Sequence, residues 1–205
     1  MLAKGFKRKV FKPVAVLAAV ILLVFLPGAV PASGGLGVQQ TKLTGLDSAG
    51  SDLFGTSVSI DGDTAVVGAK GDDDNGILSG SAYVYVLDGA GAWSQQAKVI
   101  PYDGAANDEF GVSVSISGET ITVGAHLDGW GAGKAGSVYV FVLEGDGSWR
   151  HQTTHNAVGD FADREFFGAS VSTDGETNLV GAPGDDDDGE SSGSVYVFVP
   201  FSGDS

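Results

Sequence analysis

Two short loops rich in aspartate carry the most distinctive chemistry of this sequence. The carboxylates of these loops are Asp72, Asp73, Asp74, Asp185, Asp186, Asp187 and Asp188. Calcium prefers about six to eight hard oxygen ligands from a flexible loop, and adjacent carboxylates repel one another until a cation relieves the repulsion. The loops are therefore candidate calcium sites, with a solvated acidic loop that holds no specific ion as the alternative.

A third loop lies between these two in the sequence and differs from them at its centre. It keeps one carboxylate, Asp128, and then carries Trp130 where the other loops have aspartate. An exposed tryptophan is a frequent contact residue in recognition, here for a protein or a sugar. Trp130 is therefore a candidate ligand contact, with packing over a neighbouring loop as the alternative.

The serines and carboxylates do not mark out a catalytic centre. Ser57, Ser113 and Ser170 recur in G-x-S-V-S, whereas a nucleophile elbow needs G-x-S-x-G at a strand–helix turn. Because this serine occurs three times, a role in packing is favoured over a single active site. Carboxylates are abundant but no pair stands out, so a secreted hydrolase or lyase that uses loop carboxylates remains the enzymatic alternative.

The composition excludes several classes of protein. The 205 residues include no cysteine, which excludes a disulfide scaffold, a cysteine-ligated zinc site and a thiol nucleophile. The formal net charge of −15 argues against binding to nucleic acid, because phosphate needs a basic face. So acidic a chain suits cations or basic partners.

The N-terminal segment, residues 1–32, is predicted to be a secretory signal peptide. A basic segment, Lys4–Lys12, precedes an unbroken apolar run, Val14–Leu26. As a helix this run rises about 20 Å, less than the roughly 30 Å of a hydrocarbon core. We expect cleavage after Ala32 and a secreted or cell-surface protein with no further membrane contact; an uncleaved anchor is the alternative. The portion from residue 33 onward keeps six basic and 26 acidic residues, a formal charge of −20.

Three copies of one sequence pattern follow the leader. Phe-Gly pairs begin at Phe54, Phe110 and Phe167, which gives a period of about 56 residues. The Gly-Ala pairs and the G-S-x-Y-V segments recur with the same period. Because three independent markers stay in register, the chain is predicted to consist of structural repeats. The expected repeats are residues 36–99, 100–155 and 156–205.

Each repeat is predicted to contain up to four short strands. In the first repeat, alternating apolar residues predict a strand over Gly55–Ile60, and Thr64–Ala69 reads as a more buried second strand. The segments Ser81–Leu87 and Trp93–Val99 are rich in residues that favour strands. The tight turns between the first two strands are predicted at Asp61-Gly62, Ser117-Gly118 and Asp174-Gly175.

About 56 residues and four strands per unit are typical of β-propeller blades. The succession of F-G, a hairpin, V-G-A and G-S-V-Y-V-F resembles the FG-GAP repeat, and Pro183 completes G-A-P in the third copy. The resemblance implies an all-β fold of three four-stranded antiparallel β-propeller blades, as in the N-terminal regions of integrin α-chains. It also implies a non-enzymatic binding or adhesion role toward a protein or glycan ligand, modulated by calcium. The calcium loop of integrin-type repeats lies between FG and GAP, however, and this chain has only Asp61-Gly62-Asp63 there.

The two ends of the repeat array are unequal. Gln39-Gln40 lie one repeat period before Gln95-Gln96, which predicts an orphan fourth strand over Gly37–Leu43, and the third repeat is expected to lack its last strand. Propellers close with about four to eight blades. Three interpretations stay open: a longer reading frame, an open array of three blades, or a head-to-tail homo-oligomer in which a spare strand completes a blade of another copy. A polymerising envelope unit is a further functional alternative.

Overall fold

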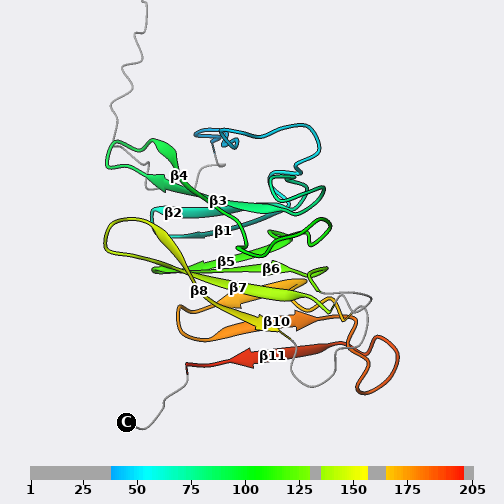
Figure 1. Cartoon of the computed structure of the whole chain (residues 1–205). Coiled ribbons are helices and arrows are strands. Elements are labelled where there is room, and N and C mark those ends of the chain that lie inside the picture. Colours follow the sequence, from blue (N-terminus) through cyan, green and yellow to red (C-terminus); the bar gives the residue numbers. More distant parts are fainter. Residues whose placement is uncertain (1–37, 130–134, 157–164, 201–205) are drawn as a thin grey trace, which may run out of the picture. The chain divides into compact units, whose positions relative to one another are not determined.

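The computed structural model describes residues 38–129, 135–156 and 165–200, which form three antiparallel sheets (Figure 1). These residues belong to one compact unit, residues 33–205, and the predicted leader lies outside the described residues. Within the described ranges no helix has the length and apolar character needed to cross a bilayer. The all-β fold expected from the sequence is confirmed.

Each sheet is a meander, in which strands adjacent in sequence are hydrogen-bonded neighbours. Blade 1 consists of β1 Ser57–Asp61, β2 Thr64–Ala69, β3 Ser81–Leu87 and β4 Trp93–Val99. Blade 2 consists of β5 Ser113–Ser117, β6 Thr120–Ala125, β7 Ser137–Leu143 and β8 Trp149–Asn156. Blade 3 consists, within the described residues, of β9 Ser170–Thr173, β10 Asn178–Ala182 and β11 Ser194–Phe198.

In blades 1 and 2 the tight turns lie one residue later than the sequence predicted. Asp61 is still paired with Thr64, so the turn residues are Gly62 and Asp63, and Gly62 has a φ of 54° that glycine adopts without steric cost. Blade 2 shows the same shift, since Ser117 is paired with Thr120. In blade 3 the last pair is Thr173–Asn178, so the predicted Asp174-Gly175 lie within the turn. The prediction was wrong because the backbone of Asp61 stays in the ladder, while its carboxylate accepts a hydrogen bond from Gly118 N–H of blade 2 at 2.6 Å.

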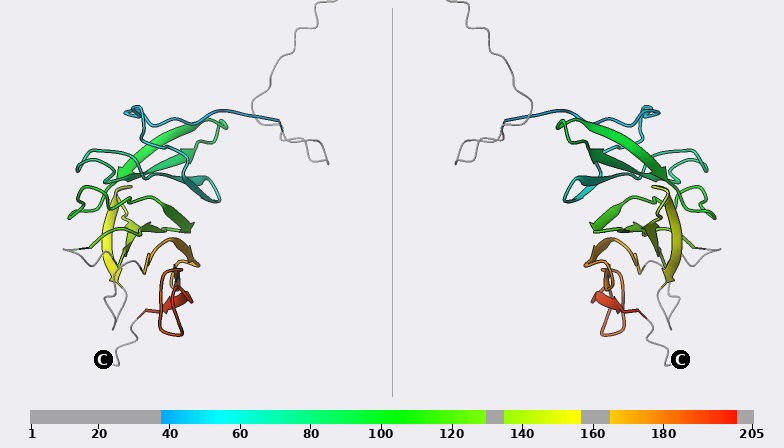
Figure 2. Two further views of the ribbon diagram at one scale, coloured as in Figure 1. Left: turned by 90° about the vertical axis from the view of Figure 1, so that its right-hand side faces the viewer. Right: turned by 90° about the vertical axis from the view of Figure 1, so that its left-hand side faces the viewer.

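Two of the three buried clusters join neighbouring blades, and the third lies between blade 1 and the segment that precedes it. The largest buried cluster joins Val66 and Val84 of blade 1 to Val114 and Ile116 of blade 2, and Trp149 packs against it. A smaller cluster joins β7 of blade 2 to blade 3. Figure 2 shows the resulting stack, in which each sheet lies against the next. Burial of these apolar surfaces is what holds neighbouring blades together.

Glycine is required where neighbouring blades approach most closely. A Cβ atom on Gly68 would lie 2.0 Å from the carbonyl oxygen of Gly111, and one on Gly124 would lie 2.0 Å from that of Gly168. Gly68 and Gly124 are the glycines of the repeated Gly-Ala pair, and Gly111 and Gly168 are those of the Phe-Gly pair. The repeat markers therefore encode contact between blades.

The repeated serines have the packing role that their repetition indicated. The Ser57 hydroxyl donates to the Gly111 carbonyl at 2.8 Å, and the Ser113 hydroxyl donates to the Gly168 carbonyl at 2.7 Å. Each bond joins the first strand of one blade to the Phe-Gly pair of the next blade.

Residues 38–46 precede blade 1 and do not contain the strand predicted over Gly37–Leu43. Gly37 lies outside the described residues, and the remainder has side-chain contacts but no strand pairing. Gln40 Nε2 donates to the Gly91 carbonyl at 2.9 Å, and Leu43 packs beside Trp93. The prediction was wrong because a strand needs a neighbour for its backbone groups, and none of the described strands lies beside this segment as a hydrogen-bonded partner.

Candidate functional site

The loops between the second and third strands of the three blades gather at one edge of the array. Their described residues are 70–80, 126–129, 135–136 and 183–193, and these lie on the right-hand side of Figure 1. Because connections alternate between the two edges of a meander, the hairpin turns after the first strands lie at the opposite edge. The three loops are therefore the counterparts of one another and form the candidate site.

The first carboxylate of each loop is hydrogen-bonded to a tyrosine of the strand that follows the loop. The hydroxyl-to-carboxylate distances are 2.9 Å for Tyr83–Asp72, 2.7 Å for Tyr139–Asp128 and 2.6 Å for Tyr196–Asp185. The tyrosines belong to β3, β7 and β11. Burial and the neighbouring carboxylates raise the pKa values of Tyr83 and Tyr139, so these phenols remain hydrogen-bond donors at neutral pH.

Backbone hydrogen bonds close the same loops at their base. Asp72 Oδ1 accepts from Asp74 N–H and Asp185 Oδ1 accepts from Asp187 N–H, both at 3.2 Å. The carbonyl of Asp185 accepts from Gly193 N–H at 2.8 Å, and blade 1 has the equivalent bond. Asp72 and Asp185, which were candidate calcium ligands, are buried residues that hold the loop base.

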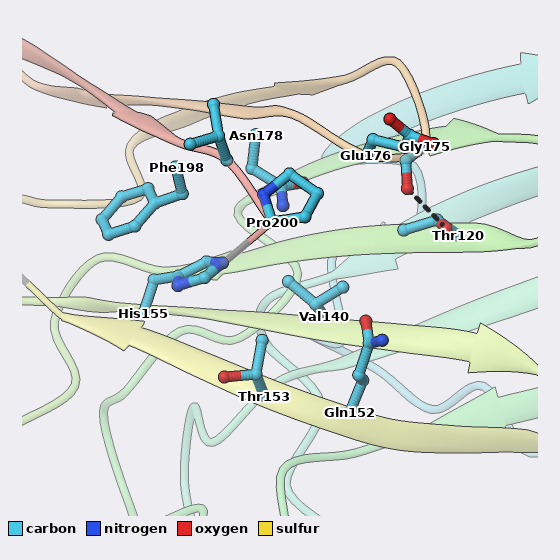
Figure 3. Close-up of a pocket in the computed structure, with 11 residues that line it drawn as sticks. Thr120, Val140, Gln152, Thr153, His155, Gly175, Glu176, Asn178, Phe198 and Pro200 are labelled. Atoms are coloured by element: carbon cyan, nitrogen blue, oxygen red, sulfur yellow. Dashed lines mark hydrogen bonds between the residues drawn. The ribbon is translucent and has the colours of Figure 1, made fainter. Parts of the chain in front are cut away.

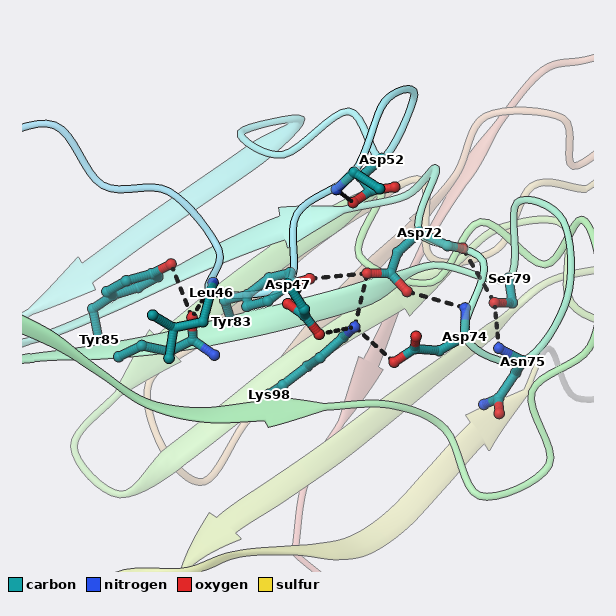
Figure 4. A network of polar contacts seen from close by, with 12 residues as sticks. Leu46, Asp47, Asp52, Asp72, Asp74, Asn75, Ser79, Tyr83, Tyr85 and Lys98 are labelled. Carbon is teal, nitrogen blue, oxygen red and sulfur yellow. Dashed lines mark hydrogen bonds and ion pairs between the residues drawn. The ribbon is translucent and has the colours of Figure 1, made fainter.

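Lys98 of β4 lies among three carboxylates of blade 1 (Figure 4). Its ammonium group is 2.8 Å from Asp47, 2.9 Å from Asp72 and 2.7 Å from Asp74. The Tyr83 hydroxyl also lies 2.9 Å from Asp47. The Tyr83 hydroxyl has only one proton to donate, so it cannot donate to Asp47 and Asp72 at the same time. The ammonium group of Lys98 donates to both of these carboxylates.

The pKa values in this cluster follow from these contacts. The hydrogen bond from Lys98 lowers the pKa of Asp47 below its ordinary value. Burial would raise the pKa of Asp72, but hydrogen bonds from Lys98, Asp74 N–H and Tyr83 outweigh it and lower the pKa. Burial would lower the pKa of Lys98, but its bonds to the three carboxylates raise it. Asp47, Asp72 and Lys98 are therefore all charged at neutral pH.

Two carboxylates of the blade 1 loop, Asp72 and Asp74, are already paired with Lys98. The ammonium group of Lys98 already supplies the positive charge that a cation would bring to Asp72 and Asp74. Among the described residues, no group of three or more acidic or histidine side chains is arranged to hold a metal ion. Calcium binding by Asp73 and by the blade 3 loop stays a prediction from the sequence.

The tips of the acidic loops are exposed, in contrast to their bases. In blade 1 the exposed tip contains Asp73, Asp74 and Asn75, and in blade 3 it contains Asp186, Asp187 and Asp188. Trp130, the candidate ligand contact of blade 2, lies outside the described residues. The arrangement can thus present carboxylates at fixed positions to a partner at this edge.

Sequence reasoning did not identify Asp47, Lys98 or the three tyrosines as parts of this site. The tyrosines stand in the repeated G-S-x-Y-V segments, and Asp47 and Asp103 are one repeat period apart, so the repeat register contained the signal for them. Lys98 has no counterpart in the second repeat, since Thr154 stands at its position in blade 2. Its role follows only from the three-dimensional arrangement.

Repeated meander sheets with loops presented at one edge define a β-propeller-type repeat protein. The FG-GAP repeat family model matches residues 38–85, 93–141 and 149–198, more than half of the chain. The protein therefore belongs to the FG-GAP repeat family.

Comparison with individual proteins adds little to this assignment. No curated protein matches the sequence. Among solved structures, the chain is similar to the periplasmic gluconolactonase PpgL of Pseudomonas aeruginosa, with 19% sequence identity and a TM-score of 0.44. The match covers 71% of this chain and 39% of that chain, so it spans about two fifths of the PpgL structure.

Proposed function

We propose that the protein is an exported, non-enzymatic binding module that presents acidic loop tips to a basic surface of a protein ligand. One observation carries the proposal: an Asp–Tyr hydrogen bond fixes the base of each loop, while the tips of the blade 1 and blade 3 loops beyond it are exposed and acidic. Rigid elements that hold variable loops in place are a common basis of recognition.

The charge of the chain supports a basic partner. Asp186, Asp187 and Asp188 place three carboxylates in succession at the tip of the blade 3 loop, and none of the ion pairs between described residues involves them. The portion from residue 33 onward has a formal charge of −20, from six basic and 26 acidic residues. Complementary charge accelerates association and selects basic partners.

The loop tips can be tested with a cationic peptide. The purified protein is passed over an immobilised decalysine peptide, and binding is measured by biolayer interferometry at low and physiological salt. The triple variant Asp186→Asn/Asp187→Asn/Asp188→Asn removes the blade 3 tip charges without altering Asp185. We expect it to weaken binding by about threefold or more, because each lost close contact costs roughly 0.2–1 kcal/mol at an exposed site.

A matched control removes the same number of charges from the opposite edge. Asp63, Glu119 and Glu176 are exposed residues of the hairpin turns after the first strands. The variant Asp63→Asn/Glu119→Gln/Glu176→Gln should retain most of the binding. Equal losses in the two variants would show that only net charge matters, and tighter binding to neutral glycans on an array would contradict the proposed class of ligand.

A further inference from the structure

The outward face of blade 3 exposes residues that the other blades bury against their next neighbour. Val195 and Val197 of β11 are 67% and 60% exposed. The residues at the same repeat positions of blade 1, Ala82 and Val84, are fully buried in the cluster shared with blade 2. The outward face of blade 3 is therefore one half of a blade-to-blade interface.

Blade 1 exposes the other half of such an interface. Val58 and Ile60 of β1 are 70% and 64% exposed. Val114 and Ile116, at the same repeat positions of blade 2, are only 8% and 6% exposed because they face blade 1. The two ends of the array are thus complementary in the same way as two neighbouring blades.

Blade 3 also carries the serine and the glycine that, in blades 1 and 2, contact the Phe-Gly pair of the next blade. Ser170 stands at the position from which Ser57 and Ser113 donate to the Phe-Gly carbonyl of the next blade, and it is exposed. Gly181 stands at the position of Gly68, yet a Cβ atom there would meet only atoms of Ser170 in its own blade. Both residues are suited to receive a Phe-Gly pair from a following blade.

The segment before blade 1 lies where the fourth strand of a preceding blade would lie. Its contacts with blade 1 match those that β4 and the residues after it make with blade 2. The matched pairs are Gln40–Gly91 at 2.9 Å and Gln96–Gly147 at 3.4 Å, and Asp47–Tyr83 at 2.9 Å and Asp103–Tyr139 at 3.0 Å. Blade 3 has no fourth strand among the described residues, so this segment is positioned to complete it.

A pocket between blades 2 and 3 lies where, in the register of the repeat, a fourth strand of blade 3 would begin. The pocket has a volume of 530 Å³, and Gln152, His155 and Phe198 are among the residues that line it (Figure 3). Gln152 stands at the repeat position of Gln96, which accepts a hydrogen bond from Trp149 Nε1 at 3.0 Å between blades 1 and 2. The corresponding space beside blade 3 is thus open where a fourth strand would begin.

We propose that the outward face of blade 3 binds blade 1 of a second copy of this chain, and that residues 38–46 of that copy complete blade 3 as its fourth strand. Two such head-to-tail contacts close a dimer of six blades. Among multiples of three blades, six is the number that falls within the roughly four to eight blades of closed propellers, and a heterologous contact forms a ring when its rotation closes. The proposal is independent of the ligand of the loop tips.

Light scattering on the purified full-length protein tests the dimer at micromolar concentration. The wild-type protein should have twice the mass of one chain. Val197→Lys on blade 3 and Ile60→Glu on blade 1 should each abolish the closed dimer, and both remain folded because the two side chains are exposed in a single copy. Ile77→Lys is the control, since Ile77 is 72% exposed on a loop tip outside both faces and should leave the dimer intact.

Mixing the two variants distinguishes a head-to-tail contact from a symmetric one. Val197→Lys keeps a native blade 1 and Ile60→Glu keeps a native blade 3, so the mixture retains one unaltered contact and should form a heterodimer. Circular dichroism confirms that each variant is folded. A wild-type protein that stays monomeric at micromolar concentration overturns the proposal, as does a mixture in which neither variant recovers association.

Discussion

Tyr139 donates its hydroxyl hydrogen to Asp128 across 2.7 Å, and the same hydroxyl lies 3.0 Å from Asp103. One phenol therefore connects β7 with the loop that follows β6 and with the segment that precedes blade 2's first strand. The equivalent pair in blade 1 is supported by Lys98, whereas in blade 2 the lysine position holds Thr154. Blade 2 thus depends more strongly on its tyrosine.

Tyr139→Phe should lower the free energy of unfolding by about 1.5–3 kcal/mol, because it removes a hydrogen bond to a carboxylate. Tyr85→Phe is the matched control, since Tyr85 donates to the neutral carbonyl of Thr44 at 2.9 Å and its loss should cost about 0.5–1.5 kcal/mol. Urea unfolding followed by circular dichroism measures both changes. Equal destabilisation in the two variants would contradict a special role for the carboxylate pair.

Lys98→Met should reduce the loss of unfolding free energy that occurs as the pH is lowered into the acid range. The lowered pKa values of Asp47 and Asp72 mean that their stabilisation is present above the ordinary value of about 4 and is lost as pH falls through their folded pKa values. Without Lys98 the chief cause of the Asp47 shift is gone, and burial dominates for Asp72. The difference in unfolding free energy between wild type and variant should therefore be largest near pH 7 and shrink below about pH 4. Urea titrations at several pH values measure it, and a difference that is constant with pH would argue against the ion cluster.

Gly68→Ala should destabilise the protein by about 1–3 kcal/mol or more, because the added methyl group would overlap the Gly111 carbonyl of the next blade. Gly89→Ala provides the control, since a Cβ atom on Gly89 has no neighbour within 4 Å and its φ is not in the left-handed region. Thermal unfolding compares the two variants with wild type. If Gly68→Ala melts at the wild-type temperature, the blades do not approach as closely as described.

Calcium binding by the blade 3 loop is checked by melting the protein with calcium and with a chelator. The sequence prediction expects millimolar calcium to raise the melting temperature, because a cation relieves repulsion among adjacent carboxylates. Asp186→Ala/Asp187→Ala should reduce that gain, while Asp73→Ala in the blade 1 loop should change it little because Lys98 lies beside that loop. Identical melting curves with calcium and with chelator would remove calcium from the description of this protein.

The sequence was sufficient to predict the strands because each marker of the repeat has a local physical cause. The strand predicted over Gly55–Ile60 overlaps β1, which runs from Ser57 to Asp61, and the strand predicted over Thr64–Ala69 has the bounds of β2. The cluster around Lys98 could not be predicted in the same way, because its three carboxylates, Asp47, Asp72 and Asp74, are all far from it in sequence. The strand predicted within residues 38–46 was wrong for a related reason. Its sequence resembles that of a fourth strand, but none of the described strands pairs with it.

The contacts between blades rely on main-chain carbonyls, serine hydroxyls and glycines, and these are the parts of the repeat that stay constant while the loop tips differ. The sequence of the loop tips can therefore change without disturbing the packing of neighbouring blades. Duplication of a gene segment that encodes one repeat would add a blade whose two faces can already pack against neighbouring blades. Propellers with different numbers of blades can therefore arise by duplication of whole repeats.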